Sequence, residues 1–132
     1  MQQSDFPISF VIITDGTVDG RIQETINSIQ SQMDDFQIIV VGGNQTSLDV
    51  DHIPFDEARS PRPWITRKKN LANSVIKHDV VVWMHDYHVF DENWYGAMVE
   101  FGLDWDIQMN QIRMITNHRM FDWVNISYPN LP

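Results

Sequence analysis

Three short runs of mostly apolar residues, rich in valine and isoleucine, constrain this chain more than any other feature of its sequence. They cover residues 8–13, 37–41 and 80–84. Strands covered by helices on both faces carry continuous apolar runs of this kind, whereas strands with one solvated face alternate apolar and polar residues. We therefore expect three buried strands of a mainly parallel sheet.

Helical periodicity separates the three runs. After the first run, apolar residues recur at steps of 4, 4, 3 and 4, which places them on one face of a helix that Thr17 or Asp19 could cap: Val18, Ile22, Ile26, Ile29 and Met33. A second helix is predicted over residues 64–77, with these side chains directed inward: Ile65, Leu71, Ala72, Val75 and Ile76. The pattern of strands and helices in alternation predicts an α/β fold, a three-layer αβα sandwich formed by one domain over residues 1–132.

The remaining elements are shorter. A weak strand is predicted over residues 50–55, and alternating apolar residues predict another strand over 107–115. Asp91 could cap a third helix that contains Trp94, Met98, Val99 and Phe101. Residues 118–132 mix aromatic and polar side chains, so that no element is assigned there.

Composition and charge exclude several classes of function. The chain has 132 residues, of which 42% are hydrophobic, which is too apolar for a disordered protein. Its net charge of −9 disfavours nucleic acid and anionic lipid as partners. No apolar run approaches the ~20 residues of a membrane-spanning helix, and the first residues lack the pattern of a secretory signal, so that we expect a cytoplasmic protein. Cysteine is absent, which excludes disulfides and thiolate chemistry.

Positive charge is concentrated in one segment. Five of the nine basic residues lie within eleven positions: Arg59, Arg62, Arg67, Lys68 and Lys69. In an acidic protein, such a concentration indicates a local site for an anion.

Polar residues follow each of the three apolar runs. Ligands of open parallel sheets bind outside the carboxyl ends of the strands. This rule points to three segments, residues 14–16, 42–44 and 85–88, which we expect to lie along one edge of the sheet.

The segment His85-Asp86-Tyr87-His88 is the most informative of the three. In an extended chain alternate side chains share a face, which would place Asp86 and His88 together, with His85 and Tyr87 on the other face. A carboxylate oxygen and an imidazole nitrogen could then bind a divalent cation. A surface turn whose polar residues merely cap the next helix is an equally good explanation, since two ligands make an incomplete site.

Taken in order, these motifs resemble the nucleotide-sugar-binding half of a GT-A glycosyltransferase, most closely of family 2. The first strand is followed by a helix ending in Ser28-Ile29-Gln30-Ser31-Gln32, then by the strand at residues 38–41 and by Lys69-Asn70-Leu71. Asp86-Tyr87-His88 and Asn93-Trp94 occupy the places of the Asp-x-Asp motif and of the helix start that follows it. The resemblance covers about residues 7 to 101.

The resemblance implies a donor site for a UDP- or GDP-linked sugar, with transfer of its glycosyl group to a carbohydrate or other hydroxyl acceptor. Asp86 and His88 would bind Mn²⁺ or Mg²⁺, which bridges the two phosphates. Lys69, with Arg67 or Lys68 nearby, stands where the family supplies a cation to the diphosphate. The base and ribose would contact Thr14 and Asp15.

Three departures from the family pattern limit this expectation. Gly42 and Gly43 stand where the family has acidic residues that hold the nucleoside, and His85 stands where an acid is common. Only 44 residues follow His88, whereas inverting members carry their general base well downstream. Asp122 is the one acidic residue after Asp106 and could act as the base, although a pairing with Arg119 is the simpler interpretation.

Two other interpretations remain open. One is a non-catalytic sugar-nucleotide-binding or assembly module that has lost the acceptor half and associates with itself or with a partner. The other is a nucleotidyltransferase, which would need a glycine-rich basic loop after the first strand; residues 14–17 provide this only faintly.

Overall fold

A computed structural model of the chain describes residues 6–17, 19–44, 46–57, 64–110, 112–113 and 119–121. The chain divides into two compact units, Met1–Gly102 and Leu103–Pro132, and each is described by itself. The described residues of the first unit form four strands and three helices: β1 (Ile8–Ile13), α1 (Asp19–Gln30), β2 (Phe36–Val41), β3 (Asp51–Ile53), α2 (Ile65–Ala72), β4 (Val80–His85) and α3 (Trp94–Phe101). It is an α/β unit, as the sequence predicts.

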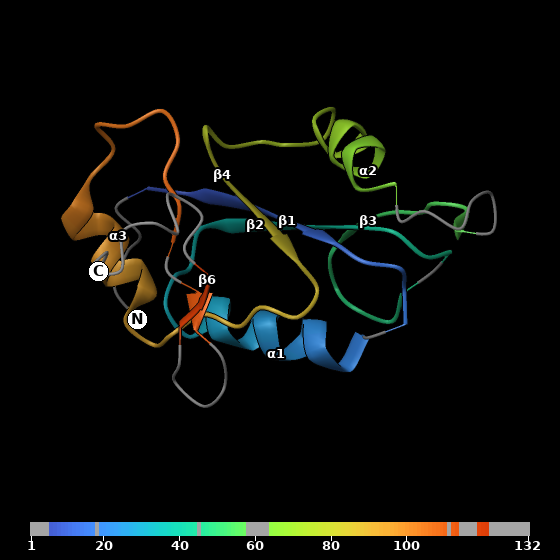
Figure 1. Cartoon of the computed structure of the whole chain (residues 1–132), viewed down its shortest axis with the longest axis horizontal. Coiled ribbons are helices and arrows are strands. Elements are labelled where there is room, and N and C mark those ends of the chain that lie inside the picture. The colour runs from blue at the N-terminus through green and yellow to red at the C-terminus, as the bar shows by residue number, and fades with distance from the viewer. Residues whose placement is uncertain are drawn as a thin grey trace. The chain divides into compact units, whose positions relative to one another are not determined.

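The four strands form one parallel sheet in the order β3-β2-β1-β4 (Figure 1). Ile8 of β1 lies opposite Phe36 of β2 and Val80 of β4, so that the strands run in step. Every residue of β1 is buried, which explains why its sequence is apolar except for Ser9, whose hydroxyl donates to the Gln37 side-chain oxygen over 2.7 Å. The three apolar runs are therefore strands of a parallel sheet, and the weak fourth strand is confirmed at its centre.

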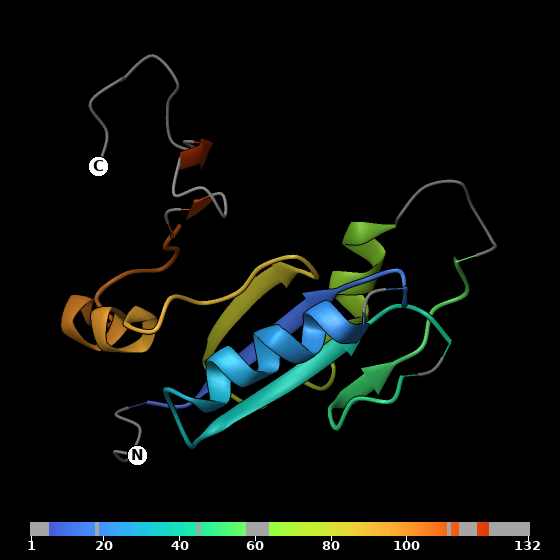
Figure 2. The ribbon, with the colours of Figure 1, turned by 90° about the horizontal axis from the view of Figure 1, so that it is seen from below.

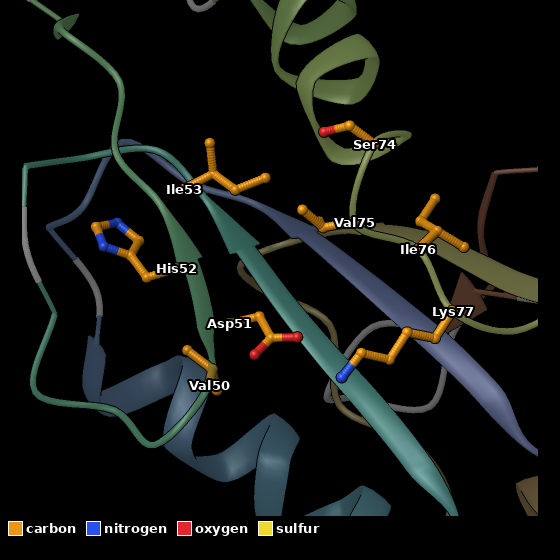
Figure 3. A pocket seen from close by; sticks show the side chains of 8 residues that line it. All are labelled: Val50, Asp51, His52, Ile53, Ser74, Val75, Ile76 and Lys77. Carbon is orange, nitrogen blue, oxygen red and sulfur yellow. The ribbon is translucent and has the colours of Figure 1, made fainter.

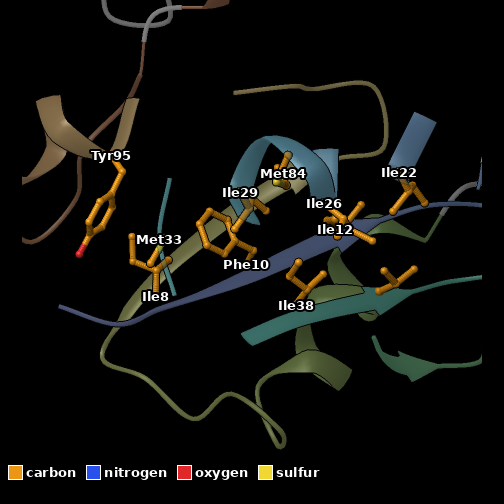
Figure 4. Close-up of a cluster of buried hydrophobic side chains, with 11 residues drawn as sticks. Ile8, Phe10, Ile12, Ile22, Ile26, Ile29, Met33, Ile38, Met84 and Tyr95 are labelled. Atoms are coloured by element: carbon orange, nitrogen blue, oxygen red, sulfur yellow. The ribbon is translucent and has the colours of Figure 1, made fainter. Parts of the chain in front are cut away.

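Helices cover both faces of the sheet, with α1 on one side and α2 on the other (Figures 1 and 2). On the α1 side, Phe10 and Ile12 of β1 pack with Ile22 and Ile26 of α1, as Figure 4 shows. On the α2 side, Val11 and Ile13 of β1 pack with Ala72 and other residues of a smaller cluster. The layers agree with an αβα sandwich. Four of the five residues predicted for the apolar face of α1 and the turn after it are buried: Ile22, Ile26, Ile29 and Met33. The fifth, Val18, lies outside the described residues.

One strand departs from the expectation of complete burial. β4 lies at the edge of the sheet, and its Trp83 is 40% exposed although it lies opposite Val11, which is 0% exposed. Trp83 lies on the same face as Val11, where α2 packs over β1 and β2. At the edge of the sheet Trp83 has a neighbouring strand on one side only, and its side chain keeps contact with water. The continuous apolar sequence of residues 80–84 did not distinguish an edge strand from a central one.

The second helix is shorter than predicted. α2 ends at Ala72 rather than at residue 77, and Leu71 and Val75, which we expected to face inward, are 41% and 37% exposed. The cause is Gln37, a buried residue of β2. Its side-chain amide donates to the Val75 carbonyl over 2.8 Å and accepts from the Lys77 backbone N–H over 2.9 Å, which holds the chain in a turn. Sequence periodicity continued through this turn and extended the helix too far.

The third helix begins later than a cap at Asp91 would place it. Asn93 is the N-cap residue of α3 and makes no side-chain cap bond, while Asp91 contributes only its backbone carbonyl, which accepts from the Trp94 N–H over 3.0 Å. Met98 is buried as expected, but Phe101 is 63% exposed. Asp91 therefore takes part in the turn before the helix rather than in capping it.

The second unit contains a short antiparallel pair, β5 (Ile112–Arg113) and β6 (Arg119–Phe121). The strand predicted over residues 107–115 is wrong for residues 107–110, which are irregular, and Ile107 is 86% exposed. Alternation favours a strand only where one face is buried, and these side chains bury none. Asp122 lies outside the described residues. Within the described part of the chain, no helix has the length and apolarity needed to cross a membrane.

Candidate functional site

Thr14 joins three strands at the carboxyl edge of the sheet. It follows β1, is 4% exposed, and its backbone N–H donates to the Val41 carbonyl over 3.0 Å. Its hydroxyl donates to Oδ2 of Asp86 over 2.9 Å and accepts from the Gly16 N–H over 3.1 Å. Because Asp86 directly follows β4, the structure brings the ends of β1, β2 and β4 together around one buried side chain. This is the edge where the sequence placed the ligand.

Gly42 and Gly43 allow two loops to touch. A Cβ atom on Gly42, whose φ is +133°, would lie 1.7 Å from the Thr14 carbonyl oxygen. A Cβ atom on Gly43 would lie 2.8 Å from the Cα atom of Gly16. The glycine pair therefore permits close backbone packing between the loops after β1 and β2. Where the resemblance would place an acid for the nucleoside, this chain presents backbone.

His52 also takes part in this edge, although no sequence pattern predicted it. Its Nε2 atom lies 2.8 Å from the Gly42 carbonyl oxygen. A carbonyl only accepts, so Nε2 carries the ring proton. His52 lies on β3, and its bond ties the fourth strand to the same loop. An isolated histidine in a weak strand carries no signal of such a contact.

Lys68 is the basic residue that reaches the edge. Its side chain is 2% exposed, and its ammonium donates to the Thr14 carbonyl over 2.9 Å and pairs with the Glu57 carboxylate. The ring of Phe55 lies 5.2 Å from the same nitrogen. Lys68 is three residues after Ile65 and four before Ala72, which puts it on the inward face of α2. That spacing would have identified Lys68 as the residue of the basic segment whose side chain faces the sheet.

The other basic residues of that segment are placed differently. Lys69 is half-buried, and Arg67 is exposed, with its guanidinium 5.3 Å from the centre of the Trp64 ring. Arg59 and Arg62 lie outside the described residues. The ammonium of Lys68 is already paired, so a bound anion would gain little from it without displacing Glu57.

After β4 the chain turns at Asp86 and Tyr87 instead of remaining extended. The rings of His85 and Tyr87 are stacked, with centres 5.7 Å apart and planes 4° apart. The His88 ring lies with them, its centre 4.5 Å from that of Tyr87 and 6.3 Å from that of His85, so His88 packs with these two rings rather than on the face opposite to them, as an extended chain would place it. Nδ1 of His88 accepts from the His85 backbone N–H over 3.4 Å. Burial, and then the neighbouring charge of His85, lower the pKa of His88, which favours the neutral imidazole.

The donor atoms around Asp86 fit a cation that arrives with ligands of its own. Oδ2 of Asp86 is held by Thr14, and within the described residues its Oδ1 makes no hydrogen bond. His88 can offer Nδ1 by giving up its long bond from His85. No group of three or more His, Asp and Glu residues in the described segments is arranged to hold a metal ion. Mg²⁺ commonly takes one or two protein ligands and completes its shell with phosphate oxygens and water.

Asp15 is exposed at the same edge. The Thr17 hydroxyl, followed by the Thr17 backbone N–H, holds the pKa of Asp15 below its usual value; the hydroxyl donates to Oδ1 over 2.6 Å and the N–H over 3.0 Å. The lowered pKa means that Asp15 favours folding at pH values above about 4 and loses this contribution as the pH falls through its folded pKa.

We predict that Thr17→Val will raise the pKa of Asp15 toward its ordinary value, because the hydroxyl is its first source of stabilisation. The backbone bond remains, so the change is partial. An NMR titration of the Asp15 carboxyl carbon checks this. An unchanged pKa in the variant would show that the hydroxyl does not stabilise the carboxylate.

The described cavities lie beside β3. An open cavity of about 700 Å³ is lined by residues 50–53 from β3 and its approach and by residues 74–77 after α2 (Figure 3). A smaller one shares Asp51 and Lys77 with it. Neither is lined by Thr14 or Asp86, but His52, which bonds to the Gly42 carbonyl at the carboxyl edge, lines the larger one.

Comparisons of the chain with protein-family models, with curated proteins and with solved structures each found no match. What the fold and site define is therefore a class: an α/β protein with a four-stranded parallel sheet. Thr14, Asp86 and Lys68 meet at its carboxyl edge.

Proposed function

We propose that this chain is a GT-A-like domain that binds a nucleoside diphosphate sugar through a divalent metal and transfers the glycosyl group to a hydroxyl acceptor. The observation that supports this most is the Asp86 carboxylate, which Thr14 holds at the carboxyl edge of the parallel sheet, and whose other oxygen makes no hydrogen bond to any described residue. A phosphate-bridging ion would need such a group at that edge.

Electrostatics favours a metal-dependent mode of binding. Asp15, Glu57 and Asp86 place three carboxylates around the ends of the strands, against the one buried ammonium of Lys68. Because Glu57 is paired with Lys68, the carboxylates of Asp15 and Asp86 are the charges left at the ends of the strands, and a metal ion would offset their repulsion of a diphosphate. Asp86 and His88 would hold Mn²⁺ or Mg²⁺, which supplies the positive charge that stabilises a leaving diphosphate.

The chain's own residues would divide the remaining work. Asp15, which is exposed between the ends of β1 and β2, would border the nucleoside, with the buried Thr14, Gly42 and Gly43 directly behind it. His85 and Tyr87 would flank the metal site with stacked rings. Arg67 and Lys69 would face the diphosphate from α2, in addition to the paired Lys68.

A second candidate function is a sugar-nucleotide-binding or assembly module without transfer activity. It is favoured by the exposed apolar side chains of the second unit: Leu103 is 49%, Ile107 86% and Met109 53% exposed. Exposed apolar side chains of this size mark surfaces that bind another protein, and a second copy of the chain would be one such partner.

Calorimetric titration with UDP- and GDP-sugars, with and without Mn²⁺, tests the proposal. We expect Mn²⁺ to raise the affinity for one donor at least ~tenfold, and Asp86→Asn, which keeps an acceptor for Thr14, to remove this gain. Asp91→Asn, an exposed carboxylate in the same segment, is the matched control and should bind as the parent does.

Two results would count against the proposal: no donor gains affinity from Mn²⁺, or Asp86→Asn binds like the parent. Release of nucleoside diphosphate in the presence of a hydroxyl acceptor then separates the two candidate functions. A transferase releases it, and a binding module does not.

A further inference from the structure

A polar stripe runs along α1 beside its apolar face. Thr25, Ser28 and Gln32 are spaced by three and four residues, which puts them on one side of the helix and of the turn that follows it. Thr25 is 1% exposed, although it is polar. In Figure 1, the chain that leaves β4 runs along this helix toward α3. We call these three residues the α1 clamp.

Gln32 makes the most contacts of the clamp. Its side-chain amide donates to the Asp91 carbonyl over 2.8 Å and to the Ser28 carbonyl over 2.8 Å, while its Oε1 accepts from the Tyr95 N–H over 2.8 Å. Tyr95 is in the first turn of α3, where backbone N–H groups lack partners within the helix. Gln32 thus supplies the cap that Asn93, the N-cap residue, does not provide.

Ser28 and Thr25 hold the preceding residues. The Ser28 hydroxyl accepts from the Phe90 N–H over 3.2 Å, and the Thr25 hydroxyl donates to the His88 carbonyl. The chain from Asp86 to Asn93 forms neither helix nor strand, so it has no backbone ladder to fix its course. Side chains of a distant helix fix it instead, with bonds at His88, Phe90, Asp91 and Tyr95.

We propose that the α1 clamp is a positioning element for Asp86 and His88. The Asp86-Tyr87 turn is bounded by the bond from Thr14 to Asp86 on one side and by the bond from Thr25 to His88 on the other. Without the second bond the turn has one fixed end, and the backbone of His88 is no longer held in place relative to Asp86. This inference rests on the proposed function for its effect on ligand binding, while its effect on the turn is independent of any ligand.

Three single variants test the clamp in the full chain. Gln32→Met keeps the length of the side chain and removes its polar atoms, and Thr25→Val keeps the shape of a buried residue and removes its donor. Gln23→Met is the matched control, because Gln23 is exposed on the same helix and its amide donates to Asn27, a neighbour on that helix. All three should retain the same sheet, because the apolar side chains of α1 are unchanged and Thr25→Val keeps the shape of the one buried residue replaced.

Two ligand-free NMR readouts come first. We expect amide exchange at Tyr95 to rise at least ~tenfold in Gln32→Met. We also expect the Asp86 carboxyl carbon and the His88 ring signals to shift in Thr25→Val, with Gln23→Met matching the parent in both. If the clamp only stabilises α3, amide exchange at Tyr95 will be faster in Gln32→Met, but the NMR signals of Asp86 and His88 will not shift in Thr25→Val. That result would overturn the inference.

The affinity for UDP in the presence of Mn²⁺ comes second. We expect it to fall about fivefold in Thr25→Val and in Gln32→Met, the effect of losing one net hydrogen bond, and to stay at the parental value in Gln23→Met. If the parent binds UDP and the clamp variants bind it equally well, the inference is wrong. If the parent gains nothing from Mn²⁺, the proposed function fails, and the ligand-free signals alone decide whether the clamp positions the turn.

Discussion

Replacing Gly42 with alanine is expected to destabilise the fold by at least ~4 kcal/mol. The new Cβ atom would lie 1.7 Å from the Thr14 carbonyl oxygen, and the neighbouring atoms are backbone at the end of β1, which cannot move aside. The φ of +133° adds strain of its own, because L side chains rarely adopt it. The loop after β2 would have to separate from the loop after β1, which also breaks the surroundings of Thr14. Chemical denaturation followed by circular dichroism measures the loss.

Two other glycines provide the control. Around Gly20 in α1 and Gly96 in α3, no described atom lies within 4 Å of the position that a Cβ atom would take, and neither residue has a left-handed φ. Alanine at either site should leave stability unchanged or raise it by up to about 1 kcal/mol, the difference in helix propensity. If Gly42→Ala were as stable as Gly96→Ala, the contact between the two loops would not exist as described.

Lys68→Met is expected to cost about 3 kcal/mol, the lower end of the range for removing one partner of a buried ion pair. The lower end applies because Glu57 is 28% exposed and regains some hydration when it loses its partner. The Thr14 carbonyl also loses a donor that lies 2.9 Å away. Lys69→Met, one position along on the same helix, should change stability by no more than ~0.5 kcal/mol.

The double variant Lys68→Met with Glu57→Leu shows how much of the lost stability comes from leaving the Glu57 carboxylate without its partner. Replacing both charges removes the uncompensated carboxylate, so most of the lost stability should return. If Lys68→Met and Lys69→Met had equal effects, the ammonium of Lys68 would not be the buried one. Urea denaturation under one buffer condition measures the free energy of unfolding of the parent, Lys68→Met, Lys69→Met and the double variant.

The sequence predicted the helices and strands that bury apolar side chains, because burial leaves a regular pattern of apolar residues in the sequence. β1 and α1 follow from runs and spacings that have one physical solution, a strand covered on both faces and a helix with one apolar face. The same signal failed for Trp83, because an apolar strand at the edge of a sheet has the same composition as a central one. It failed for residues 107–110, where alternation came without burial.

What the sequence did not predict depends on polar side chains that are buried through distant partners. Gln37, which is in β2, holds the turn that ends α2, and Gln32, which follows α1, caps α3. The sequence around α2 or α3 gives no sign of either contact, because the partner is distant in the chain. In the site, the sequence correctly predicted that Asp86 and Thr14 lie at one edge of the sheet. The resemblance pointed to Lys69 as the cation for a diphosphate, whereas the lysine that contacts Thr14 is Lys68. The choice between the two lysines depends on the phase of α2, which the helical spacing of Ile65 and Ala72 fixes.

A crystal structure of the protein with UDP and Mn²⁺, with anomalous data collected at the manganese edge, tests the central claim most directly. We predict one anomalous peak at the carboxyl edge of the sheet, bound by an oxygen of Asp86, a nitrogen of His88 and oxygens of both phosphates. A nucleotide bound elsewhere, or a diphosphate at this edge with no manganese between it and Asp86, would contradict the proposal.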